Sequence, residues 1–244
     1  MTRRWTRVVL LMVGGLSGLT VSATAEARGN HTIQSFQTAK RASATVFRGQ
    51  ETTFYCGCPY TGNAVDLPAC GYVPQSTAKR AKRLEGEHVV PAENFGRAFP
   101  EWWEGRPACV DRRGKSFTGR NCARKVSIPF RLMESDLYNL QPAIGEVNGR
   151  RSNYRMAMIP GEQRAFGRCD VEIAERRMEP RPAIRGDIAR TSFYMEWAYG
   201  RRLISAAARQ LFEVWDKTDP VDAWERERAR RIQAIQGNAN PFIK

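Results

Sequence analysis

Histidine is nearly absent from this chain of 244 residues, which contains only His31 and His88. Because histidine is the commonest side chain for proton transfer near neutral pH, few positions are open to such chemistry. His31 lies in a polar run, whereas His88 follows Glu87 in the string Arg83-Leu84-Glu85-Gly86-Glu87-His88-Val89-Val90-Pro91-Ala92. His88 is therefore the candidate general base. The alternative is that Glu87 and His88 have only a structural role, as the polar end of a strand above the buried Val89-Val90 pair.

The chain also lacks a long hydrophobic run that would span a membrane, which requires ~20 apolar residues. Three arginines precede a shorter apolar run from Val8 to Val21, and Ala23-Thr24-Ala25 follows with small residues. This pattern is typical of a secretory signal peptide cleaved after Ala25. An uncleaved membrane anchor is the alternative. We expect residues 26–244 to form an exported domain, periplasmic or secreted, without stable membrane association.

No Cys-x-x-Cys pair is present, and Cys56-Gly57-Cys58 is a poor substitute, which argues against the usual zinc sites. The chain has six cysteines, and an even number in an exported protein favours disulfide bonds. Six cysteines allow 15 connectivities, so the sequence alone does not pair them. Our working hypothesis joins the local pairs Cys58–Cys70 and Cys109–Cys122 and the distant pair Cys56–Cys169.

Acidic residues are outnumbered by basic ones, 25 against 39, so the formal net charge is +14. Removing the signal peptide removes three arginines and no acids, so the exported part carries 14 − 3 = +11. Arginine binds phosphate through a planar set of donors. Nucleic acid and an anionic envelope surface are both compatible partners, and the charge alone does not require either. We expect a monomer.

Three helices are predicted near the C-terminus, beginning at Asp187, Ser205 and the Asp219-Pro220 pair. An irregular segment, residues 94–125, precedes them and contains arginines, aromatic residues and two of the cysteines. Long ordered loops are uncommon unless they carry a function or a covalent link. Residues 145–153 are expected to form a polar loop that contains arginine.

Asn139 lies in the string Met133-Glu134-Ser135-Asp136-Leu137-Tyr138-Asn139-Leu140-Gln141-Pro142. Ser135 or Asp136 can cap a short helix there, with Asn139 on a different side from Leu137. The amide oxygen of Asn139 could bind a hard cation, although an asparagine near a helix start is usually a capping or turn residue.

Several strings together resemble one family. They are Phe54-Tyr55-Cys56-Gly57-Cys58, Cys70-Gly71-Tyr72, Glu87-His88-Val89-Val90-Pro91-Ala92, Phe95-Gly96, Met133 to Pro142, Gly145-Glu146-Val147-Asn148-Gly149, Ile188-Ala189-Arg190-Thr191, Gln236-Gly237-Asn238 and Asn240-Pro241-Phe242. Their order and content resemble the bacterial endonuclease I family of exported nucleases. The resemblance covers essentially the whole exported chain.

The resemblance implies an α+β fold with a ββα-metal core, also called a His-Me finger, in a disulfide-linked single domain. By analogy, His88 would activate water, and Glu87 and Asn139 would bind the cation. Arg106, in Trp-Glu-Gly-Arg, would hold the scissile phosphate, although its surroundings match the family less closely. The cation would be Mg²⁺, with Ca²⁺ or Mn²⁺ as alternatives.

The implied function is sequence-nonspecific cleavage of DNA to 5′-phosphate products, with RNA left open as a second substrate. Two alternatives remain: an extracellular ribonuclease of the same fold, and a catalytically inactive cationic protein that binds nucleic acid or the envelope. The chain departs from many relatives in having Arg226 where they have a cysteine, and in lacking another near the C-terminus. Arg150 stands where an acid often occurs.

Overall fold

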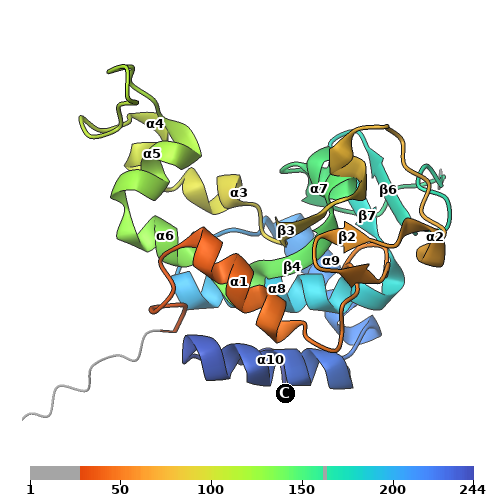
Figure 1. The fold of residues 1–244 in the computed structure, drawn as a ribbon. Coiled ribbons are helices and arrows are strands. Elements are labelled where there is room, and N and C mark those ends of the chain that lie inside the picture. Colours follow the sequence, from red (N-terminus) through yellow and green to blue (C-terminus); the bar gives the residue numbers. More distant parts are fainter. Residues whose placement is uncertain (1–27, 162–163) are drawn as a thin grey trace, which may run out of the picture.

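The computed structural model describes residues 28–161 and 164–244 as a mixture of short helices and short strands (Figure 1). The predicted signal peptide, residues 1–25, lies outside the described residues. The α-helices are α1 (Phe36–Val46), α2 (Leu67–Cys70), α3 (Ala92–Gly96), α4 (Pro100–Trp103), α5 (Gly119–Val126), α6 (Ile128–Glu134), α7 (Gly145–Arg151), α8 (Arg185–Tyr199), α9 (Ala206–Thr218) and α10 (Ala223–Gln236). The 3-10 helices are η1 (Lys79–Lys82), η2 (Leu137–Asn139) and η3 (Pro182–Ile184). The predicted α+β class is confirmed.

The described strands form three small sheets. They are β1 (Tyr60–Thr61) with β2 (Ala64–Val65), β3 (Leu84–His88) with β4 (Leu140–Ile144), and β5 (Arg155–Met156), β7 (Arg177–Pro180) and β6 (Val171–Ala174) in the order β5-β7-β6. The β3–β4 pair is antiparallel, with Glu87 opposite Gln141 and His88 opposite Leu140. Helix α7 follows β4 directly, so two strands and a helix form one unit in the middle of the molecule (Figure 1).

Two hydrophobic cores meet along this central unit. The first, here the α7 core, contains Val147 of α7 and side chains from residues 54–72 and from β6, β7, α8 and α9. The second, here the α1 core, contains Val46 of α1 and side chains from α3, α6, η2 and α10. Consecutive residues divide between them, because Val89 belongs to the α7 core and Val90 to the α1 core. The end of β3 therefore lies at the junction of the two cores.

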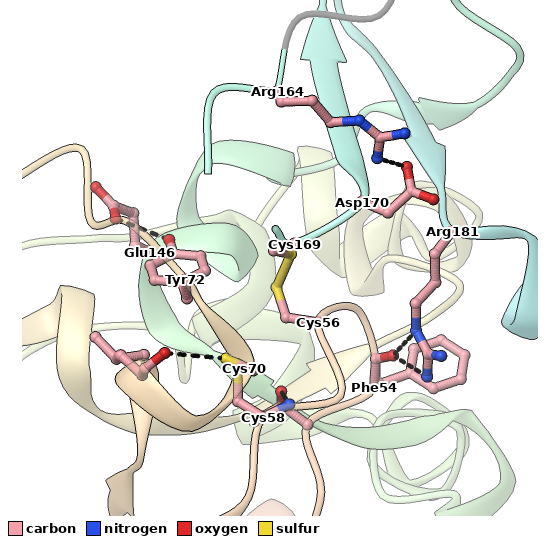
Figure 2. Close-up of a disulfide and its surroundings, with 12 residues drawn as sticks. Phe54, Cys56, Cys58, Cys70, Tyr72, Glu146, Arg164, Cys169, Asp170 and Arg181 are labelled. Atoms are coloured by element: carbon pink, nitrogen blue, oxygen red, sulfur yellow. Dashed lines mark hydrogen bonds and ion pairs between the residues drawn. A yellow bond between two sulfur atoms is a disulfide. The ribbon is translucent and has the colours of Figure 1, made fainter. Parts of the chain in front are cut away.

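Two disulfide bonds link segments around the α7 core, and a third lies at α5. The structure joins Cys56–Cys169, Cys58–Cys70 and Cys109–Cys122, which are the three pairs of the working hypothesis. The Cys56–Cys169 bond closes a loop of 113 residues, and the chain-entropy account assigns larger stabilisation to longer loops. Figure 2 shows this bond between the Tyr72–Glu146 hydrogen bond and the contacts of Arg181 with the carbonyl oxygen of Phe54.

The helix starts were predicted with mixed success. Ser205 caps α9 by accepting a hydrogen bond from the amide of Ala208, as expected. The prediction for α8 is wrong, because that helix begins two residues earlier and Asp187 lies in its first turn. The third helix begins later than expected, at Ala223, where Asp222 is the N-cap.

Candidate active site

A cleft of about 1170 Å³ opens at the end of β3. Its walls come from α1, the β1–β2 hairpin, η1, β3, α7 and the start of α5. Glu87 and His88 both line it, although neighbours on a regular strand face opposite sides. Both can do so because His88 is the last residue of β3, where the two cores meet.

Glu87 is held from the side of the α7 core. Its Oε1 accepts a hydrogen bond of 2.8 Å from the Tyr55 hydroxyl and one of 2.9 Å from Nη1 of Arg151. Burial raises the pKa of Glu87, and the positive charge of Arg151 opposes that shift. Neither of these hydrogen bonds uses Oε2, and Glu87 lines the cleft.

Helix α7 positions two polar side chains against β3. Besides binding Glu87, Arg151 donates to the carbonyl oxygens of His88 at 2.8 Å and Val89 at 2.6 Å, which fixes the backbone where the strand ends. Asn148 lies three residues earlier and therefore shares a face of the helix with Arg151. Its Nδ2 donates to Oε2 of Glu85 at 2.9 Å, and no hydrogen bond among the described residues uses its Oδ1. Asn148 also lines the cleft.

His88 is held from the side of the α1 core. Its ring stacks on Phe36 with 5.0 Å between centroids, and its Nε2 lies 2.8 Å from the backbone oxygen of Glu134. A carbonyl oxygen only accepts, so Nε2 carries the proton and Nδ1 has the free lone pair. Burial, followed by the positive charge of Arg120, lowers the pKa of His88 to about 4. The imidazole is therefore neutral at pH 7.

Glu134 also binds two arginines through its side chain. Its carboxylate accepts hydrogen bonds from Nε of Arg120 at 2.6 Å and Nε of Arg124 at 2.7 Å. Arg120 lines the cleft, and its Nη2 is buried without a hydrogen-bond partner among the described residues. An unpaired buried donor is costly, so this atom is a natural contact for an anion in the cleft.

The structure does not bring Asn139 into the cleft. This residue is fully buried, its Oδ1 accepts from the amide of Val90 at 2.7 Å, and its Nδ2 donates to the carbonyl oxygen of Val90 at 2.9 Å. Both halves of the carboxamide are therefore used to hold the backbone after β3. The expected placement of Asn139 beside a cation is corrected, and Asn148 is the asparagine that faces Glu85 and the cleft.

Arg106 is also not a cleft residue. Its guanidinium pairs with Glu101 at 3.5 Å and Glu104 at 3.0 Å, and it lines a separate depression with Phe117 and Thr118. Among the arginines of residues 94–125, Arg120 is the one that lines the cleft. No sequence signal separates Arg120 from Arg106, because both lie in the irregular segment of residues 94–125. The role of His88 as general base and that of Glu87 as a cation ligand stay predictions.

Sequence comparisons show which family this chain belongs to. The family model described as Endonuclease I matches residues 24–244. The chain belongs to the endonuclease I family. It is 44% identical over 218 residues to a periplasmic deoxyribonuclease of Aeromonas hydrophila, a match that covers 86% of each chain. It is 43% identical over 233 residues to an extracellular deoxyribonuclease of the same organism, which covers 93% of this chain and 94% of the relative.

A more distant relative is named as a ribonuclease. The extracellular ribonuclease of Bacillus subtilis is 31% identical over 134 residues, covering 45% of this chain and 43% of the relative. Within residues 28–161 and 164–244, no helix combines the length and apolar character needed to cross a bilayer. The resemblance inferred from the sequence is confirmed by the family match. The predicted location, periplasmic or secreted, agrees with the names of the two Aeromonas relatives.

Proposed function

We propose that this member of the endonuclease I family is a metal-dependent, sequence-nonspecific endonuclease that hydrolyses DNA to 5′-phosphate products. The observation that carries the proposal is the state of His88. Its Nε2 is committed to the Glu134 carbonyl and its pKa is far below 7, so Nδ1 can accept a proton from water. The relatives named deoxyribonucleases support DNA as the substrate.

The residues present fit a hard divalent cation, Mg²⁺ first and Ca²⁺ or Mn²⁺ as alternatives. Oε2 of Glu87 and Oδ1 of Asn148 are oxygen donors, the type that these ions prefer. The described residues contain no group of three or more His, Cys, Asp and Glu side chains suited to a metal. Water and substrate phosphate would thus complete the shell. When bound, the cation would stabilise the negative charge that develops on the phosphate and the leaving oxygen.

The other residues of the cleft support these two roles. Arg120 would contact the scissile phosphate through its unpaired Nη2. Arg151 favours the ionised form of Glu87 and fixes the backbone of His88. In this proposal β3, β4 and α7, which carry Glu87, His88, Asn148 and Arg151, would form the ββα-metal unit that the family resemblance implies. Nonspecific cleavage follows if the cationic surface holds the DNA backbone and few side chains read base edges.

A plasmid-nicking assay with the oxidised protein tests the proposal. We expect Mg²⁺ to support conversion of supercoiled plasmid to nicked and linear forms, EDTA to stop it, and excess Mg²⁺ to restore it. The fragments should be substrates for ligase without prior phosphorylation, which identifies 5′-phosphates. Cleavage that continues in EDTA would contradict the metal requirement. Binding of DNA without cleavage under any metal would favour the inactive binding protein.

A ribonuclease function is the second candidate, and the match to the Bacillus subtilis ribonuclease is the observation that favours it. Parallel digestion of duplex DNA and single-stranded RNA at equal nucleotide concentration separates the two. We expect the DNA to be cleaved at least as fast as the RNA. An RNA rate far above the DNA rate would reverse the assignment.

A further inference from the structure

The chain between α4 and α5 forms a protruding arm, defined here as residues 104–118. Figure 1 shows this segment at the top left, beyond α4 and α5 and away from the two cores. The Cys109–Cys122 disulfide ties its base to α5, and a bridge between Val110 and Ser116 closes its tip. The amide of Asp111 also donates to the carbonyl oxygen of Lys115 at 2.9 Å. The tip is thus a tight, covalently anchored turn.

The tip carries three exposed cations within four residues, Arg112, Arg113 and Lys115. The one acid in the turn, Asp111, accepts the backbone N–H groups of Arg113 and Lys115 at 2.8 and 2.9 Å. Its carboxylate therefore shapes the turn, and none of the three cationic side chains forms an ion pair among the described residues.

Several exposed arginines of the chain are paired with acids, while others, such as Arg41, Arg48 and Arg202, stand singly rather than in a cluster. Arg80 and Arg83 bind Glu85, and Arg230 binds Glu227. An unpaired cluster on a rigid turn keeps its full charge for a partner. Cations in this arrangement fit an extended polyanion with closely spaced charges, such as a duplex, which carries one charge per ~1.7 Å of its axis.

The arm is continuous with the cleft. Helix α5 begins where the arm ends, and its Arg120 lines the cleft with an unpaired Nη2. Cys122 of the same helix anchors the arm. One structural unit thus presents one cation to the cleft and three cations outside it.

We propose that the tip of the arm binds the sugar–phosphate backbone of duplex DNA outside the cleft. This inference rests on the proposed DNA-cleaving function and adds the surface that holds the rest of the substrate. Arginine and lysine contacts to phosphate carry no base information, so the tip would strengthen binding without sequence preference. The contribution would require a substrate long enough to extend from the cleft to the tip.

The test compares two variants that each lose two positive charges. Arg112→Gln/Arg113→Gln alters the tip, and Arg202→Gln/Lys217→Gln alters exposed cations that do not line the cleft. Binding to a 30-base-pair duplex is measured in EDTA, so that no cleavage occurs, across a salt titration. Each lost phosphate contact reduces the slope of log K against log salt by about 0.9. We expect a reduction of about 2 for the tip variant and no change for the control.

A small chromogenic phosphodiester, bis(p-nitrophenyl) phosphate, reports on the fold and the cleft. With Mg²⁺ present, both variants should turn it over like the unaltered protein, because this substrate cannot reach the tip. Equal duplex affinity and equal salt slopes for the two variants would overturn the proposal. So would a tip variant that loses binding to phosphatidylglycerol vesicles while keeping its duplex affinity. Failure of the unaltered protein to bind or cut DNA would instead refute the proposed function and the inference with it.

Discussion

The two neighbours at the end of β3 are held by different halves of the molecule. Glu87 is bound from the α7 core by a guanidinium and a phenol, whereas His88 is bound from the α1 core by a carbonyl oxygen and an aromatic ring. Burial disfavours the charged form of both, which raises the pKa of Glu87 and lowers that of His88. Only Glu87 has a buried cation that opposes the shift. A carboxylate that binds a cation must be ionised, and an imidazole that acts as general base must be neutral. The surroundings of Glu87 and of His88 therefore suit the roles proposed for them.

The largest effect is expected from His88→Ala, which removes the base and leaves the carboxylate side intact. Removing a general base costs roughly 10²–10⁴-fold in rate. DNA binding in EDTA should be largely unchanged, because the cationic surface is untouched. The measurement is the nicking rate alongside a binding titration. His31→Ala is the matched control, since it removes the one other histidine of the chain and should leave the rate unchanged.

Arg151→Met tests the buried ion pair between Arg151 and Glu87. It leaves Glu87 buried without its cation, and breaking a buried ion pair on one side costs about 3–5 kcal/mol. The loss should be visible in the free energy of unfolding measured by denaturant titration. Arg230→Met is the control, because the Arg230–Glu227 pair is exposed and such pairs contribute about 0–1 kcal/mol. Equal losses for both variants would show that Arg151 does not stabilise the site.

The two asparagines give a more discriminating pair of effects, because each variant should change a different property. Asn148→Ala should raise the Mg²⁺ concentration for half-maximal activity about tenfold or more, a loss of at least about 1.4 kcal/mol. Its effect on unfolding should be small. Asn139→Ala should do the reverse, because it leaves two buried backbone groups of Val90 unpaired at about 1–3 kcal/mol each. A shifted Mg²⁺ requirement in Asn139→Ala alone would restore the original assignment.

Local sequence patterns predicted much of this structure. Short spacings suggested the Cys58–Cys70 and Cys109–Cys122 bonds, and Ser205 marked the start of α9. Glu87 and His88 could be singled out because histidine is so scarce and the surrounding string is rare. Features encoded within a few neighbouring residues were therefore accessible without coordinates.

Asn148 and Arg120 could not be identified as cleft residues from local sequence patterns. Gly145, Asn148 and Gly149 are weak helix formers, so residues 145–153 read as a loop. Helix α7 forms because distant groups bind it, as when Glu146 accepts hydrogen bonds from the Tyr72 hydroxyl and the Gln75 amide. Arg106 and Arg120 both lie in the same irregular segment. Tertiary contacts alone separate the residue that faces the cleft from the one that pairs with nearby acids.

The smallest expected effect concerns the charge state on the imidazole side. In metal-free protein carrying His31→Ala, the remaining histidine signals in the proton NMR spectrum belong to His88. They should titrate with a midpoint near pH 4, since burial and the Arg120 charge both disfavour the imidazolium. Below that midpoint the ring is protonated and cannot accept a proton from water, so the base would be lost as the pH falls through 4.

Adding Arg120→Gln removes one of the positive charges that lowers this pKa, so the midpoint should move to higher pH. The Glu134 carboxylate, which favours the imidazolium, stays in place, and Arg124 still opposes it. Arg106→Gln should leave the midpoint unchanged, because that arginine lies outside the cleft and pairs with Glu101 and Glu104. A midpoint near the ordinary histidine value in the starting protein would mean that the α1 core does not hold the imidazole neutral by burial. The contrast between the two sides of β3 would then no longer explain how a charged carboxylate and a neutral base come to be neighbours.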